Sequence, residues 1–399
     1  MNIILSGGWG YGNLGDDAIL VSSIHLLKNK YPGCFITILS YNTRETLKIV
    51  SGWQNVEVKE SLHERLFGLT HKDFIFGQNL YGEISSPIMR RIKNTINPIK
   101  KNYQIGSFVK NPQCYYSIHK RVLTDYINLC KTSDLYVMSG GGYLTTWAEM
   151  LISKYCEVHF AKESNMKIFI IGQSIGPFKN NSWNLARMVL QESDGMFFRD
   201  YESIKDAQHM GMNCYERVVP DLVLANEFEH SKGNYIVFIP FLTDLNQNMN
   251  NIIDNISKIV NNDGVSVIIT VSQLWPWSIQ IALSFYFAIK AKDIDVRLIV
   301  PKDYKELTSI LASAQMTFSQ NLHGLILSYC SHTPIVSLNK RRKFISFMEK
   351  IGHPDYMFNP CEIKSDSLYN CYNHKNTFDF RVLKSLKKEI EMALTKVVI

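Results

Sequence analysis

The sequence of 399 residues contains few cysteines and no apolar run long enough to span a membrane. Its eight cysteines are scattered without a C-x-x-C pair, which argues against a zinc site and against a disulfide framework. Residues 1–7 form neither a basic n-region nor a long apolar h-region. We therefore expect reduced, mostly buried thiols and a cytoplasmic protein without a signal peptide.

Acidic residues are absent between Glu83 and Asp125, where eight basic residues lie. The net charge of the whole chain is +7, so the remainder is close to neutral. The basic segment of residues 84–124 suits an anionic partner, such as the inner face of a membrane contacted peripherally or a lipid-linked pyrophosphate. A solvated insertion loop explains the same charges equally well. Nucleic acid is not expected, because the rest of the chain shows no recognisable binding motif.

Apolar runs of strand length alternate with helical patterns in both halves of the chain. This alternation predicts right-handed βαβ units and parallel sheets, and the length exceeds that of one ordinary core. We predict an α/β protein of two Rossmann-like domains facing across a cleft, residues 1–228 and 229–399, with a basic insertion at about 62–125. The predicted strands are 2–6, 35–39, 135–139, 167–172, 195–200, 235–241, 265–271, 296–300 and 335–338.

The first strand is followed by a glycine-rich turn that satisfies G-x-G-x-x-G at Gly10, Gly12 and Gly15. We reject a dinucleotide site, because Asp16 and Asp17 at the start of the next helix would repel a pyrophosphate. Two interpretations of Asp16 remain. It either caps the helix, or it contacts a ligand to which the glycines bring the backbone close.

Several polar or glycine-rich segments follow later strands of the first half. Residues 140–142 are three glycines, which serve either a tight turn or the close approach of a ligand. Gln173 directly follows a further strand, at the sheet edge where open α/β sheets bind ligands. Arg199 offers a planar fork of donors to a carboxylate or phosphate, or else forms a salt bridge with Asp200 or a neighbour.

In the second half, residues 310–338 read as strand, short helix and strand. This pattern places His323 at a helix N-terminus, where free N–H groups and the helix dipole bind anions. Lys343 lies just past the second of these strands. A proton-transfer group and a fixed cation are thus predicted at one sheet edge.

Six segments resemble, in order and spacing, those of the polysaccharide pyruvyltransferase family. They are residues 13–16, 140–142, 173–177, 199–203, 220–221 and 319–324, the last followed by Lys343. The resemblance implies a GT-B-like architecture with the acceptor on the first domain. It also implies transfer of the enolpyruvyl carbons of phosphoenolpyruvate to two hydroxyls of one sugar as a cyclic ketal, in the biosynthesis of a cell-surface polysaccharide such as an exopolysaccharide or a capsule.

The chemistry of this transfer suggests roles for the matching residues. His323 is the expected general acid and base, and Asp16 is either a base or a group that orients the acceptor. Lys343 and Arg199 would hold the charges of the donor. The remaining expected substrate-binding residues are Asn13, Gly141, Gln173, Ser203, Asp221, Ser319 and Asn321, with Asp221 expected to orient a partner rather than react.

The sequence departs from the family pattern at Asn321, where an arginine is expected. Asparagine supplies no charge, so Arg341 or Arg342 is expected to replace the arginine. We expect no metal and no cofactor, with phosphoenolpyruvate as co-substrate and a glycan acceptor, free or lipid-linked. The alternatives are a glycosyltransferase of the same architecture with a nucleotide-sugar donor, for which Asn321 is natural, and a binding protein that has lost catalysis.

Overall fold

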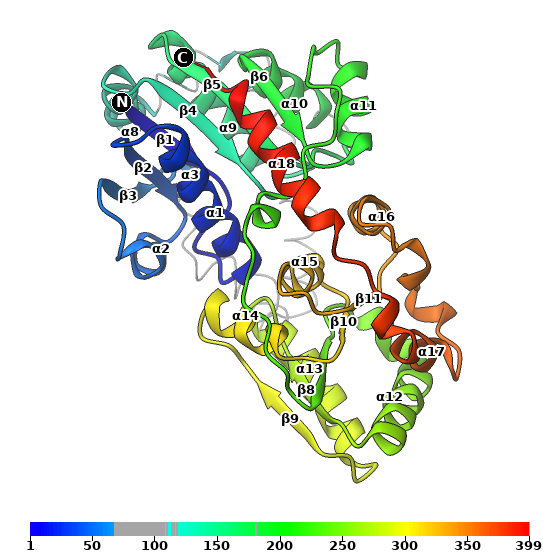
Figure 1. Cartoon of the computed structure of the whole chain (residues 1–399). Coiled ribbons are helices and arrows are strands. Elements are labelled where there is room, and N and C mark those ends of the chain that lie inside the picture. The colour runs from blue at the N-terminus through cyan, green and yellow to red at the C-terminus, as the bar shows by residue number, and fades with distance from the viewer. Residues whose placement is uncertain (68–107, 109–110, 113–115, 117–118, 180–181, 399) are drawn as a thin grey trace, which may run out of the picture. The chain divides into compact units, whose positions relative to one another are not determined.

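The computed structural model describes residues 1–67, 108, 111–112, 116, 119–179 and 182–398. Almost all of the predicted basic segment, residues 84–124, lies outside this part of the chain. The described residues form two sheets of parallel strands with flanking helices, as predicted (Figure 1). The strand order is β3-β2-β1-β4-β5-β6 in the first sheet and β11-β10-β7-β8-β9 in the second.

The first sheet is built from strands whose central members are buried on both faces, which explains their continuous apolar runs. Its strands are β1 (Asn2–Ser6), β2 (Phe35–Ser40), β3 (Val56–Glu60), β4 (Leu135–Ser139), β5 (Lys167–Gln173) and β6 (Gly195–Phe198). Its helices are α1 (Leu14–Lys30), α2 (Thr43–Val50), α3 (Leu62–Phe67), α8 (Lys120–Lys131), α9 (Ala148–Glu163), α10 (Ser182–Gln191) and α11 (Tyr201–His209).

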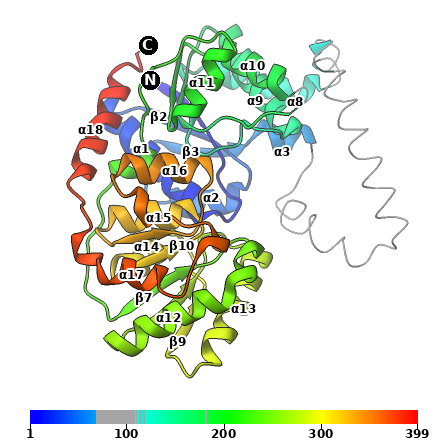
Figure 2. The same cartoon turned by 90° about the vertical axis from the view of Figure 1, so that its right-hand side faces the viewer.

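The second sheet lies between two layers of helices, with α12 and α13 on one side and α14 and α15 on the other (Figure 2). Its strands are β7 (Tyr235–Ile239), β8 (Ser266–Thr270), β9 (Val296–Ile299), β10 (Thr317–Ser319) and β11 (Ile335–Ser337). The helices are α12 (Met249–Asp263), α13 (Pro276–Lys290), α14 (Tyr304–Ala312), α15 (Leu322–Cys330), α16 (Arg342–Lys350), α17 (Ser367–Asn373) and α18 (Val382–Thr395).

Contacts divide the chain into two compact units that exchange short segments. Unit 1 comprises Met1–Tyr11, Ile19–Asp221 and Met392–Ile399, and unit 2 comprises Gly12–Ala18 and Leu222–Glu391. The predicted division at residue 228 assigns one continuous stretch to each domain. The structure instead groups the turn that begins α1 with unit 2, because Leu14 N donates to Ser272 O (3.0 Å) and Leu274 N donates to Gly12 O (2.7 Å).

Each sheet has a point at which the order of its strands reverses, between β1 and β4 in unit 1 and between β7 and β10 in unit 2. Open α/β sheets bind ligands outside the carboxyl ends of the strands at such switch points. The segments that follow these four strands are therefore the first places to look for a site.

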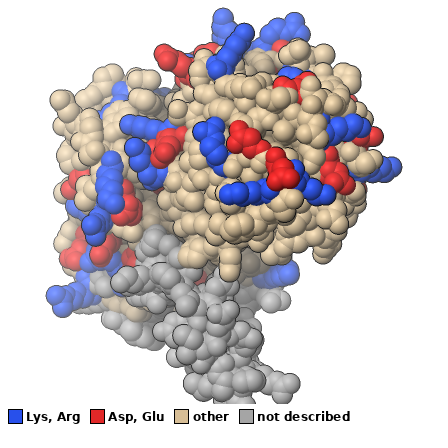
Figure 3. All heavy atoms as spheres, turned by 90° about the horizontal axis from the view of Figure 1, so that it is seen from below, with Lys and Arg blue, Asp and Glu red and all other residues tan. Residues whose placement is uncertain are grey.

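One face of the described part of the chain carries mixed charge. On the face drawn in Figure 3, Lys and Arg side chains lie next to Asp and Glu rather than in one patch. Five of the seven described cysteines are buried and all seven are free thiols, which confirms the expectation for this part of the chain. Among the described helices, none combines the length and apolar character that crossing a membrane requires.

Candidate active site

The turn before α1 is shaped by Asn13. Its Oδ1 accepts a hydrogen bond from Gly15 N (3.2 Å), and its Nδ2 donates to Asp16 Oδ2 (2.8 Å). Asn13, rather than Asp16, therefore caps the helix, and the capping interpretation of Asp16 is wrong. The Asp16 carboxylate lies half-buried on the first turn, at the positive end of the helix dipole.

His323 lies on the first turn of α15, as predicted. Asn321 is the N-cap of this helix, with Oδ1 accepting from His323 N (3.0 Å) and Gly324 N (3.4 Å). The imidazole packs so closely on Gly15 that a Cβ at that position would collide with the ring. Two segments that are far apart in the sequence thus meet within unit 2, and only glycine permits the contact.

Ser319 and Gly324 form the tight turn from β10 into α15. The Ser319 Oγ donates to Asn321 O (2.8 Å) and accepts from Asn321 N (3.0 Å). A Cβ on Gly324 would lie 2.6 Å from that Oγ. Ser319 is fully buried, so its hydroxyl shapes the turn that presents His323.

Basic residues follow the neighbouring strand β11, whose Ser337 is in register with Ser319 of β10. Arg341 is the N-cap residue of α16, and Arg342 and Lys343 are its first two residues. Arg341 and Lys343 are exposed, and Arg342 is half-buried. Because parallel strands end at the same edge of a sheet, these cations and His323 belong to one edge.

Gln320 joins the end of β7 to the end of β10 at the switch point of this sheet. Its Oε1 accepts from Phe241 N (2.9 Å) and Leu242 N (2.5 Å), and its Nε2 donates to Asp244 Oδ1 (2.5 Å). Sequence reasoning missed Gln320 and Asp244, because an amide that bonds backbone groups 78 to 79 residues away leaves no local pattern.

Three aromatic side chains, Phe241, Trp275 and Trp277, lie at the same edge and were also missed. Their ring centroids are 4.8 to 6.5 Å apart. The sequence does indicate this cluster, because Trp275-Pro-Trp277 comes soon after a predicted strand. Large aromatic residues are not needed there to form the core.

In unit 1, Arg199 lies at the end of β6 beside the glycine loop. Its Nη1 forms an ion pair with Asp221 (2.5 Å), and its Nε donates to Ser174 Oγ (2.8 Å). Its Nη2 faces Gly142, at 3.5 Å from where a Cβ would be. The predicted salt bridge of Arg199 is therefore formed with Asp221, and Asp200 instead caps α11.

The glycine loop and the loop after β5 are held together by buried polar groups. Gln173 Nε2 donates to Gly140 O and to the Tyr143 hydroxyl. Ser203 Oγ accepts from Ile175 N (2.9 Å) and donates to Asp200 Oδ1 (2.8 Å). Gln173 and Ser203 are fully buried, so these contacts position the loops.

Beneath this loop lies a fully buried ion pair on α9, between Lys154 Nζ and Glu157 Oε2 (2.9 Å). Lys154 also donates to Ser6 Oγ (2.6 Å), and its ammonium lies 5.6 Å from the ring centroid of Tyr143. Burial lowers the pKa of Lys154, opposed by the charge of Glu157. Burial and then the charge of Lys154 lower the pKa of His63 to about 4.

The predicted residues thus form two groups. Unit 2 contains Asn13, Asp16, Ser319, Asn321, His323, Arg341, Arg342 and Lys343. Unit 1 contains Gly141, Gln173, Arg199, Ser203 and Asp221. In unit 2, the residues from Ser319 to Lys343 follow β10 and β11. The turn of Asn13 and Asp16 follows β1 of the first sheet and is bonded to the segment after β8.

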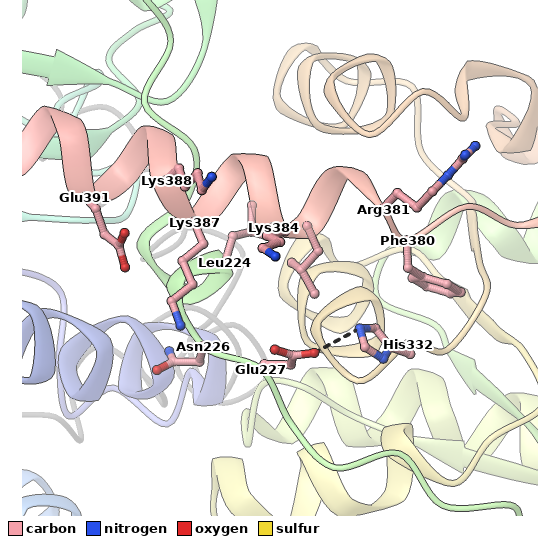
Figure 4. Close-up of a pocket in the computed structure, with 11 residues that line it drawn as sticks. Leu224, Asn226, Glu227, His332, Phe380, Arg381, Lys384, Lys387, Lys388 and Glu391 are labelled. Carbon is pink, nitrogen blue, oxygen red and sulfur yellow. Dashed lines mark ion pairs between the residues drawn. The ribbon is translucent and has the colours of Figure 1, made fainter.

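A pocket of about 630 Å³ lies elsewhere in unit 2 (Figure 4). Lys384 and Lys387 project from α18, Lys387 points toward Asn226, and Glu227 pairs with His332 at 3.5 Å. The residues that line it are Leu224, Asn226, Glu227, His332, Phe380, Arg381, Leu383, Lys384, Lys387, Lys388 and Glu391. None of the predicted site residues is among them.

Comparison with known proteins identifies a family. The family model described as polysaccharide pyruvyl transferase matches residues 13–340, which include the turn at Asn13 and the segment around His323. No curated protein is similar enough in sequence to be recognised as a relative.

Solved structures share the fold at low sequence identity. UDP-GlcNAc 2-epimerase from Methanocaldococcus jannaschii is similar with a TM-score of 0.62 and 9% identity, covering 99% of this chain and 100% of that one. The enzyme from Neisseria meningitidis bound to UDP-GlcNAc gives 0.56 and 9%, covering 100% and 99%. Anabaena Alr3699/HepE in complex with UDP gives 0.54 and 9%, covering 99% and 95%. These similarities establish the GT-B fold.

Proposed function

The chain belongs to the polysaccharide pyruvyl transferase family, and we propose that it transfers pyruvate from phosphoenolpyruvate to two hydroxyls of a sugar as a cyclic ketal. The product would enter a cell-surface polysaccharide, such as a capsule or an exopolysaccharide. The observation that supports this most strongly is the packing of His323 on Gly15. It brings an imidazole and the helix turn that carries Asp16 into one unit.

The reaction forms two C–O bonds at C2 of the donor and breaks one. The first hydroxyl oxygen attacks C2 as C3 gains a proton. The second oxygen then takes the place of the phosphate, which leaves with the remaining hydroxyl proton. In this scheme His323 delivers the proton to C3, since an imidazole exchanges protons near neutral pH. Asp16 accepts a hydroxyl proton or orients the hydroxyls.

Phosphoenolpyruvate carries a carboxylate and a phosphate, and both require fixed positive groups. Asn321 cannot supply positive charge, because its amide is neutral, and its Oδ1 caps α15. Arg199 is already neutralised by Asp221, so it offers N–H groups near Gly142 rather than a net charge. The donor's charge in this proposal therefore falls on Arg341, Arg342 and Lys343.

The acceptor in this proposal is a glycan, free or linked to a lipid pyrophosphate. The basic segment 84–124 would contact the pyrophosphate or the membrane surface peripherally, from the cytoplasmic side. The scheme needs no cofactor besides phosphoenolpyruvate as co-substrate.

The full chain, incubated with phosphoenolpyruvate and a panel of sugar acceptors, tests the proposal. We expect phosphate release that depends on the acceptor and falls about 10² to 10⁴-fold in His323→Asn, because proton transfer is lost. His332→Asn is the matched control, since His332 lies in the pocket of Figure 4 and has a left-handed backbone that asparagine tolerates. Undiminished release by His323→Asn, or none with any acceptor, would contradict the proposal.

A second candidate is a glycosyltransferase with a nucleotide-sugar donor. It is favoured by Asn321 at the position of the family arginine and by the fold shared with a protein bound to UDP-GlcNAc. A thermal-shift comparison separates the two candidates, because a ligand that binds the folded chain raises its melting temperature by mass action. Stabilisation by UDP-GlcNAc and not by phosphoenolpyruvate would favour the second candidate.

A further inference from the structure

Phe241, Trp275 and Trp277 form a cluster at the carboxyl edge of the second sheet, here called the aromatic platform. Phe241 follows the end of β7, and the two tryptophans lie at the start of α13, after β8. The centroid distances are 4.8 Å for Phe241 and Trp277, 5.4 Å for the two tryptophans and 6.5 Å for Phe241 and Trp275. All three side chains are partly exposed.

Packing covers the platform only in part. Trp277 packs against a hydrophobic cluster of unit 2, and Phe241, Trp275 and Trp277 all remain partly exposed. Single apolar side chains are often exposed on a protein surface without any function. Aromatic rings that are grouped and accessible at a sheet edge are instead typical of a binding surface.

A fixed carboxylate lies next to the platform. Gln320 is almost fully buried and bonds Phe241 N on one side and Asp244 Oδ1 on the other. Asp244 is half-buried, and an ionised carboxylate offers about four lone-pair positions to donors. The amide of Gln320 therefore holds an acceptor of hydrogen bonds at a set position beside an apolar ring surface.

We propose that the aromatic platform and Asp244 bind the pyranose ring of the acceptor sugar. A pyranose has an apolar face of C–H groups that packs on an aromatic ring, and hydroxyls at its edge that donate to a carboxylate. The ring planes are inclined by 43 to 49°, so they form a curved surface rather than a parallel slot for a flat base. A carboxylate beside the rings disfavours a phosphate there.

The position of the platform agrees with this role. Trp275 directly follows Leu274, whose N–H donates to Gly12 O (2.7 Å), and Asn13 forms a β-bridge with Gln273. The platform is therefore continuous in the chain with the segment that holds the turn of Asp16. This inference rests on the proposed function, and it assigns the acceptor to unit 2 rather than to the first domain.

Saturation-transfer NMR with methyl pyranosides of glucose, galactose, mannose and N-acetylglucosamine tests the subsite. We expect the wild-type chain to saturate the C–H protons of one face of at least one of these sugars. The signal should fall at least tenfold in Trp275→Ala, remain in Trp275→Phe, which keeps a flat ring, and weaken in Asp244→Asn. Phe287→Ala is the matched control, because Phe287 is 63% exposed on the same helix α13.

The subsite is overturned if no pyranoside is saturated by the wild-type chain, or if Trp275→Ala and Asp244→Asn both bind like wild type. It is also overturned if uridine diphosphate, rather than a pyranoside, requires Trp275. If Trp275→Ala fails to fold, Asp244→Asn alone decides. Thermal shifts with phosphoenolpyruvate are measured on the same samples. If a pyranoside binds but phosphoenolpyruvate gives no thermal shift, the proposed function alone is contradicted. If phosphoenolpyruvate gives a thermal shift but no pyranoside binds, the subsite alone is contradicted.

Discussion

Small residues determine the geometry of the site before any reactive group is considered. Gly15 leaves room for the imidazole of His323, and Gly324 leaves room for Ser319. Asn13 and Asn321 cap the two helices that meet there. These four residues fix the shape of the two turns from which the helices begin.

Gly15→Ala tests the contact with His323. The added Cβ would collide with the ring, so the imidazole must move. We expect phosphate release to fall by about 100-fold, since a shift of about 1 Å costs that much at a reacting centre. The melting temperature should fall moderately, because overpacking costs about 1–3 kcal/mol.

Gly52→Ala is the control for this substitution, because a Cβ at Gly52 meets no atom within 4 Å. It should leave both the rate and the melting temperature nearly unchanged. A Gly15→Ala chain that releases phosphate as fast as the Gly52→Ala chain would show that the position of the ring does not matter.

His63 makes stability depend on pH. Its folded pKa is lowered to about 4, below the ordinary 6.5, so the folded chain binds fewer protons between these values than the unfolded chain. The contribution of neutral His63 to the free energy of unfolding is therefore complete above about pH 6.5. It falls by up to about 3 kcal/mol as pH decreases toward 4. Chemical unfolding between pH 4 and 7 should therefore show a shallower pH dependence in His63→Gln.

The control is His25→Gln, which removes an exposed histidine from α1. It should reproduce the wild-type dependence. If the free energy of unfolding depends on pH equally in His63→Gln and in the wild type, then burial does not lower the pKa of His63 as described.

At the scale of elements, the site is assembled from strand ends and helix starts. The helices α1, α15 and α16 begin with residues of the site, and the first turn of α1 is acidic whereas that of α16 is basic. The basic residues at the start of α16 add charge to this arrangement.

Replacing Arg341 and Arg342 together by alanine tests whether they substitute for the family arginine. Loss of charge-assisted hydrogen bonds, each worth about 1.5–3 kcal/mol, should raise the Kd of phosphoenolpyruvate at least about tenfold. Lys350→Ala is the control, because Lys350 is at the far end of the same helix and pairs with Glu389 at 2.7 Å. Calorimetric titration measures the Kd of phosphoenolpyruvate for both variants. An unchanged Kd in the double variant would show that Arg341 and Arg342 do not take the role of the family arginine.

The elements were predictable where their patterns are local. Strands buried on both faces, such as β4, show uninterrupted apolar runs, and their predicted bounds agree with the structure. Strand β3 was missed because it is a short edge strand in which valine alternates with charged residues, Val56-Glu-Val-Lys-Glu60. A segment with so many charged residues was not recognised as a strand. The N-cap role of Asn13 could be seen only once the helix start was known, and the same holds for Asn321.

At the scale of the whole molecule, the two parallel sheets followed from the alternation of strands and helices. The alternation could not show which residues belong to which unit. Residues 12–18 join unit 2 through hydrogen bonds to a segment about 260 residues away. Such bonds leave no pattern in the sequence. The same reason hid Gln320 and the carboxylate of Asp244, which are placed by long-range contacts alone.

The central claim is that the donor is phosphoenolpyruvate and that its C2 becomes a ketal carbon. The most direct measurement is the carbon NMR spectrum of the acceptor after reaction with phosphoenolpyruvate labelled at C2. The account predicts a labelled quaternary carbon bonded to two acceptor oxygens, with one phosphate released per product and a methyl group on the neighbouring carbon. Label that stays in phosphoenolpyruvate, or appears only in free pyruvate, would contradict it.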